Sequence, residues 1–110
     1  MTFDEYQKQA LKTLIHNPDP LMHPTILAMG VVGEAGEVIE KWKKIVAYKD
    51  GVMTEEDRAE LGKELADVIW YIAVLAHELG MSLDDLMQQN LDKLASRKAR
   101  GTQKGAGDNR

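Results

Sequence analysis

Residues 30–46 read "GVVGEAGEVIEKWKKIV", and this stretch decides what kind of fold the chain can form. Its apolar residues recur with the spacing of one helix face, yet Glu34 lies within that face. The apolar residues within about 60° of Glu34 on a helical wheel are Leu27, Val31, Val38 and Ile45. The stretch therefore predicts a helix that carries a carboxylate at a position suited to the core.

The rest of the chain predicts three more helices and no strand, so the expected fold class is all-α and resembles a four-helix bundle. Thr2 and Glu5 have the spacing of a capping box. Thr54 and Asp57 repeat that spacing, and Gly80 is placed to end the helix that follows. The expected helices span residues 3–15, about 25–48, 55–79 and 83–100.

Two segments are expected to lie outside these helices. Three prolines between residues 18 and 24 predict an extended crossover rather than a helix. Residues 1–100 are expected to form one domain, and residues 101–110, "GTQKGAGDNR", a flexible, glycine-rich, basic tail.

The third predicted helix is apolar on all sides from Leu65 to Leu79. Its main seam is expected to comprise Leu61, Leu65, Val68, Ile72, Leu75 and Leu79. A helix that is apolar all round must be covered on more than one side, and a short chain has little material for this. We therefore expect a homodimer.

Composition narrows the possible functions. The 110 residues contain no cysteine, which excludes disulfides and thiolate metal sites, and no apolar run long enough to span a membrane. The first residues lack the pattern of a signal peptide, so we expect a cytoplasmic protein. The net charge of −4 argues against partners such as nucleic acid or an anionic membrane. Basic residues gather from Lys93 onward, and we expect any anionic ligand to be held there.

The carboxylate at Glu34 belongs to a larger pattern. Glu37 follows it by one turn, and Glu64 with Asp67 repeats the i, i+3 spacing beside the seam of the third helix. A single Glu-x-x-Glu is usually a solvated helix face, but two such pairs on otherwise apolar faces would repel each other if buried. Carboxylate oxygens are the ligands that Mg²⁺ and Mn²⁺ prefer, so the two pairs predict a divalent-metal site.

The histidines do not fit a transition-metal site. A di-iron bundle needs Glu-x-x-His motifs, and none of His16, His23 and His77 completes one. Ligation by oxygen alone favours Mg²⁺, with Mn²⁺ as a substitute, and these ions commonly bring phosphates with them.

Three segments together resemble one family. "GEAGEVIE" (33–40), "ELADVIWYI" (64–72) and "NLDKLASRKARG" (90–101) are similar to segments of the all-α nucleoside triphosphate pyrophosphohydrolases of the MazG type, and the similarity covers residues 25–100. The resemblance implies Mg²⁺-dependent hydrolysis between the α- and β-phosphates, which yields a nucleoside monophosphate and pyrophosphate. It also implies dimers or dimers of dimers.

The resemblance assigns roles to individual residues. The implied metal ligands are Glu34, Glu37, Glu64 and Asp67. Glu37 would also deprotonate the attacking water. The expected substrate-binding residues are Tyr71, Asn90 and Lys93, to which we add Lys41 and Arg97. We expect the pocket for the base to be built from the first helix, residues 16–24 and a partner subunit, with Tyr6 or Trp42 as candidates.

Three alternatives remain at this point. The chain could be a non-catalytic helical dimerisation or regulatory module, which would need no metal. It could bind nucleic acid through its basic C-terminal end, against which its acidic total argues. A transition-metal oxidase is the weakest alternative, because the histidine ligands are missing.

Overall fold

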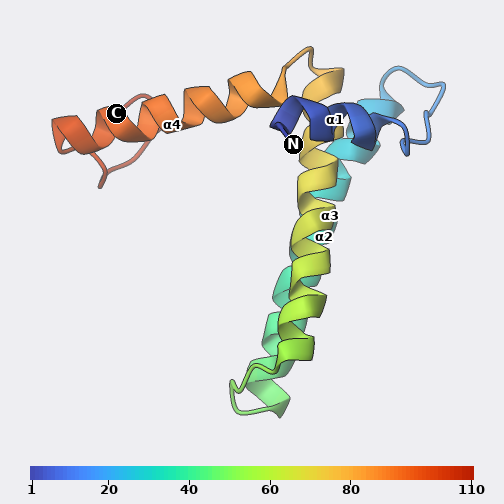
Figure 1. Ribbon diagram of the computed structural model, residues 1–110, viewed down its shortest axis with the longest axis vertical. Helices are drawn as coiled ribbons and strands as arrows, with labels where there is room; N and C mark the ends of the chain where they lie inside the picture. The colour runs from blue at the N-terminus through green and yellow to red at the C-terminus, as the bar shows by residue number, and fades with distance from the viewer.

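The computed structural model describes all of residues 1–110 and confirms an all-α fold without strands. Its helices are α1 (Phe3–Leu11), α2 (Met22–Tyr48), α3 (Glu55–Glu78) and α4 (Leu83–Arg100). The longest two, α2 and α3, run antiparallel and side by side, and α4 leaves the end of α3 nearly at a right angle (Figure 1).

The helix starts that the capping residues predicted are confirmed. Thr2 Oγ1 accepts a hydrogen bond from Glu5 N at 3.0 Å, and Glu5 Oε2 accepts one from Thr2 N at 2.8 Å. Thr54 and Asp57 make the same reciprocal pair at the start of α3. The chain then turns at Gly80, whose φ of 74° favours glycine.

The crossover between α1 and α2 differs from the prediction at both ends. α1 ends at Leu11 rather than near residue 15, because Thr13 turns back and its hydroxyl donates to Ala10 O at 2.8 Å. α2 begins at Met22, so it includes Pro24. A proline is tolerated in the first helical turn, where its missing N–H would have no partner within the helix. Asp19 Oδ1 accepts hydrogen bonds there from Leu21 N and Met22 N.

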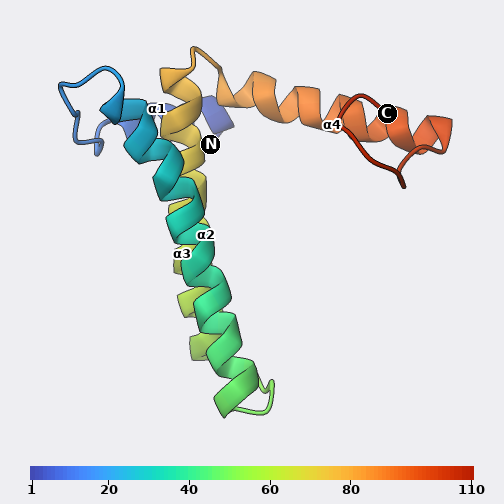
Figure 2. The same ribbon diagram turned by 180° about the vertical axis from the view of Figure 1, so that it is seen from behind.

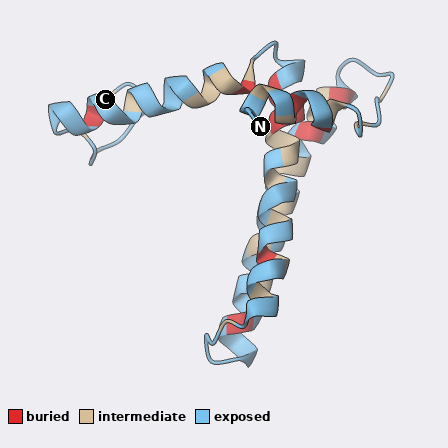
Figure 3. Ribbon diagram, viewed as in Figure 1, coloured by how far each residue is buried: buried red, intermediate tan, exposed pale blue.

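One end of the α2–α3 hairpin holds most of the core, and we call it the packed end. There α1 lies across the hairpin, and the buried side chains of Ala10, Leu27 and Val74 meet (Figure 3). Gln7 of α1 is also buried. Its Nε2 donates to Ala73 O at 3.0 Å and to Met81 O at 3.1 Å, so its polar atoms are satisfied.

The predicted seam of α3 is partly wrong. Leu61 is buried as expected, but Leu65 and Leu79 are 53% and 60% exposed. The buried residues of α3 near its C-terminus are the smaller Ala73, Val74 and Ala76. The reason is that α1 and α2 approach the face that carries these small residues, whereas periodicity alone favoured the leucines.

The carboxylate of Asp4 ties the start of α4 to α1. Asp4 accepts hydrogen bonds from Ser82 Oγ at 2.8 Å and from Asp84 N at 2.9 Å, which ties α1 to α4. Beyond this junction α4 extends into solvent, as the view from behind also shows (Figure 2). The radius of gyration is 17.0 Å, against about 13 Å for a compact domain of this length.

No single helix is both long and apolar enough to cross a membrane; α3 and α4 meet that criterion only as a pair, bent by 104°. Residues 101–110 fold back along α4, so that the C-terminus lies beside it (Figure 1). The expected flexibility of this tail stays a prediction.

Candidate metal centre

Three carboxylates from α2 and α3 come together partway along the hairpin. Glu34 projects from α2, and Glu64 and Asp67 project from successive turns of α3. One oxygen from each lies within 4.8 Å of the others. We call these three residues the carboxylate cluster. The cluster contains three of the four acids that the sequence predicted to form a metal site, and Glu37 is the one that it lacks.

The cluster carries more negative charge than the protein around it offsets. Partial burial raises the pKa of Glu34, and the charges of Asp67, Glu64 and Glu37 raise it further. The cation in contact is Lys41, whose Nζ lies 3.4 Å from Glu64 Oε1. Glu34 is half-buried rather than enclosed in the core as expected. The donors are all carboxylate oxygens, which are ligands suited to hard divalent cations such as Mg²⁺ and Mn²⁺.

Glu37 stands apart from the cluster in this chain. It is exposed, one turn beyond Glu34 on α2, and it is absent from the group of three whose oxygens converge. Its negative charge still acts on Glu34. Its predicted roles as a metal ligand and as the base that deprotonates water stay predictions.

Tyr71 and Gly30 form the contact between the helices next to the cluster. Tyr71 lies one turn after Asp67 on α3, and a Cβ added to Gly30 of α2 would collide with its ring. Gly30 therefore allows the two helices to approach closely at this point, whereas Gly33 and Gly36 face open space.

The structure does not bring the other predicted substrate residues to the cluster. Asn90, Lys93 and Arg97 lie on α4, which makes no contact with α2. Lys93 Nζ and Arg97 Nη2 instead lie 3.0 Å and 3.3 Å from Asp108 Oδ1 of the tail. Lys41, by contrast, contacts Glu64 of the cluster, and its expected role in substrate binding stays a prediction.

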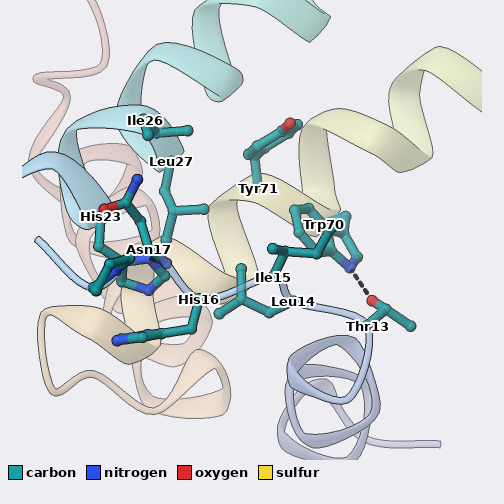
Figure 4. Close-up of a pocket in the computed structure, with 11 residues that line it drawn as sticks. Thr13, Leu14, Ile15, His16, Asn17, His23, Ile26, Leu27, Trp70 and Tyr71 are labelled. Atoms are coloured by element: carbon teal, nitrogen blue, oxygen red, sulfur yellow. Dashed lines mark hydrogen bonds between the residues drawn. The ribbon is translucent and has the colours of Figure 1, made fainter.

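A cavity of about 400 Å³ opens one helical turn from the cluster, on the side of Tyr71 (Figure 4). Residues 13–18 form one wall, and Trp70 donates a hydrogen bond from Nε1 to Thr13 Oγ1 at 2.9 Å across it. His23 is buried in another wall. Asn17 N donates to its Nδ1, so Nε2 carries the proton and donates to Glu78 Oε1 at 3.1 Å.

Sequence reasoning expected residues 16–24 to form a pocket but missed which side chains take part. Thr13 and His23 lie within the two segments that were expected to build the pocket but were not named individually, and Trp70 of α3 was not proposed. Of the two aromatic candidates, Trp42 is half-exposed and does not line this cavity. Tyr6 packs against the core, and burial together with the charge of Asp67 raises its pKa.

Comparisons with known proteins agree with this geometry. The model of the MazG nucleotide pyrophosphohydrolase domain matches residues 22–101, which includes α2, α3, α4 and the whole cluster. The Gene 37 protein of Mycobacterium phage L5 is 47% identical over 114 residues, an alignment that covers all of both chains. No solved structure matches the chain significantly. The match covers most of the chain and includes the three carboxylates of the cluster. The chain therefore belongs to the MazG nucleotide pyrophosphohydrolase domain family.

Proposed function

We propose that the chain is a Mg²⁺-dependent nucleoside triphosphate pyrophosphohydrolase that converts an NTP or dNTP to the monophosphate and pyrophosphate. The observation that carries this proposal is the carboxylate cluster, which is shared by two helices and has one lysine in contact. Mg²⁺ bound there would supply positive charge against the polyphosphate and polarise a phosphoryl oxygen. Mn²⁺ is the expected substitute.

The chain's own residues divide the remaining work. Glu34, Glu64 and Asp67 would hold the ion, and Glu37 is the fourth ligand expected from the resemblance. Glu37 also accepts a proton from the water that attacks phosphorus, and the phosphoanhydride bond between the α- and β-phosphates breaks. Pyrophosphate leaves, and Glu37 returns its proton to solvent. Positioning and charge stabilisation are the main contributions expected for such a reaction.

The nucleoside end fits the cavity beside Tyr71. The cavity offers the apolar surface of Leu27 and Trp70 together with polar groups on residues 13–17, a combination suited to a base and sugar. Tyr71 borders both this cavity and the contact next to the cluster, so a nucleotide can lie across it. We propose removal of unwanted nucleotides from the cytoplasmic pool as the role of this reaction.

The active assembly is proposed to be a homodimer or a dimer of dimers. Val32, Ile39 and Val46 recur every seven residues on α2, and they are 73%, 68% and 56% exposed. A heptad stripe of β-branched residues is the pattern that a second helical hairpin covers. A second copy would also bring an α4, with Asn90, Lys93 and Arg97, toward the cluster that its own α4 does not reach. Sedimentation equilibrium tests this: wild type should sediment as a dimer or tetramer, and a monomeric wild type would refute it.

Product analysis tests the proposed reaction. Purified protein with Mg²⁺ is incubated with canonical and modified NTPs and dNTPs, and the products are separated. Monophosphate plus pyrophosphate, lost on chelation, is the expected result. Diphosphate plus phosphate would contradict the bond assignment. Absence of turnover from a folded, metal-loaded protein would favour the alternative of a non-catalytic dimerisation or regulatory module.

A further inference from the structure

The C-terminal half of α4 and the tail form a second charged cluster, separate from the carboxylate cluster within one chain. Lys93 and Arg97 lie one turn apart on α4, and Asp108 bridges them. Arg97 also donates to the carbonyl oxygen of Asp108 at 2.6 Å. Both basic groups lower the pKa of Asp108, with the hydrogen bond from Lys93 as the first cause.

Arg97 is more deeply buried than a guanidinium on an outlying helix needs to be. It is 6% exposed, and its Nε has no hydrogen-bond partner. Thr102 Oγ1, at the start of the tail, is also buried without a partner. A buried guanidinium with an unused donor is a costly arrangement unless an acceptor occupies the site in some other state.

Lys93 and Asp108 border a hollow large enough for a small anion, which Arg97 itself does not line. Its volume is about 350 Å³, and its polar lining comes from Gln89, Asn90, Lys93 and Asp108. Asp108 is the single acid among residues 93–110, and its side chain is 81% exposed. The one acidic side chain of the tail thus contacts both Lys93 and Arg97 of α4, while its outer side is open to solvent.

We propose that Asp108 is a tethered competitor: in the free protein it occupies Lys93 and Arg97, two of the expected substrate-binding residues, at the position where the phosphate chain of a nucleotide would bind. The inference deepens the proposed function and rests on it for the identity of the anion. A phosphate group brings several acceptor oxygens, so it satisfies Lys93 and the fork of Arg97 better than one carboxylate does. Binding of the anion then displaces Asp108 and frees residues 101–110.

The size of the competition follows from the exposure of Asp108, whose side chain is 81% exposed, and of its partner Lys93, at 37%. Exposed charge pairs are weak, so removal of the competitor is expected to tighten anion binding by about two- to five-fold rather than by orders of magnitude. An effect in this range adjusts the substrate concentration at which the site fills, and it does not switch the protein off.

Calorimetric titration with tripolyphosphate, on the full chain with a chelator and at low salt, tests the site without turnover. Asp108→Asn should bind about two- to five-fold more tightly than wild type, and Lys93→Gln should bind more weakly. Two matched controls correct for net charge: Asp92→Asn removes a nearby carboxylate of α4, and Lys98→Gln removes an exposed cation of α4. Both should bind close to wild type.

Any of three results would overturn the inference. These are binding by Asp108→Asn no tighter than by Asp92→Asn, an equal loss in Lys98→Gln and Lys93→Gln, or no binding by any variant. Amide relaxation gives a second readout, because tripolyphosphate should raise the mobility of residues 101–110 in wild type. A tail that stays equally rigid in the complex would show that Asp108 is not displaced.

The same titration separates this inference from the proposed function. Glu37→Gln should keep tripolyphosphate binding even where turnover is lost. A chain that binds tripolyphosphate in this way but hydrolyses no nucleotide would refute the proposed reaction and leave the anion site standing.

Discussion

The packed end and the carboxylate cluster lie on the same two helices but satisfy their polar groups in different ways. At the packed end, buried Gln7 and His23 each find partners within the chain. At the cluster, three carboxylates face one another and one lysine contacts them. The first region is complete by itself. The second lacks positive charge, which is the property of a site that binds a cation.

The largest effect is expected on turnover, from a change that leaves the packed end untouched. Glu37→Gln removes charge and basicity with little change in volume, and loss of a general base typically slows a reaction by about 10²–10⁴-fold. Because Glu37 is exposed, the melting temperature should stay close to that of wild type. Steady-state kinetics and thermal melting measure the two quantities. Undiminished hydrolysis would refute the role assigned to Glu37.

A substitution at the packed end is expected to lower the stability of the fold. Leu27 is 3% exposed, so Leu27→Ala is expected to reduce the free energy of unfolding by about 2–5 kcal/mol. Leu91→Ala on α4, where the residue is 59% exposed, is the matched control, with a change of about 0.5 kcal/mol or less. Urea denaturation measures both. Equal losses would show that another surface, such as a second copy, covers α4.

Gly30 lies where the packed end meets the cluster, and Gly33 is its control. Gly30→Ala forces the Tyr71 ring to move, and overpacking of this kind costs about 1–3 kcal/mol. Gly33→Ala faces open space and should stabilise α2 by up to about 1 kcal/mol. Thermal unfolding of the two variants is the measurement. A stabilising Gly30→Ala would mean that the helices are further apart than described.

The smallest effect is expected at the far tip of the hairpin, where a carboxylate is fully paired. The hydrogen bond from Lys49, aided by Thr54, lowers the pKa of Asp57 from 3.8 to about 2. A lowered carboxyl pKa stabilises the fold above pH 3.8, and this contribution is lost as the pH falls through about 2. Asp57→Asn should therefore be slightly destabilised at pH 7 and match wild type near pH 2. A difference independent of pH would contradict this.

The sequence predicted features that depend on neighbours along the chain. Capping residues located the starts of α1 and α3, and helical spacing placed Glu34, Glu64 and Asp67 on facing sides of two helices. It missed features that depend on tertiary contacts. Periodicity could not show that Leu65 is exposed, and it gave no direction for α4 after Gly80. The return of the tail onto Arg97 is made by Asp108, eight residues beyond the end of α4.

The account's central claim is that the cluster binds a divalent cation, and a melting experiment with added Mg²⁺ tests it most directly. A ligand at 100 times its Kd stabilises the native state by about 2.7 kcal/mol, so the melting temperature of wild type should rise by several degrees. Glu34→Gln should abolish this rise, and Glu56→Gln, an exposed acid in the first turn of α3, should keep it. A wild-type melting temperature that does not change up to millimolar Mg²⁺, or an equal rise in Glu34→Gln, would contradict the claim.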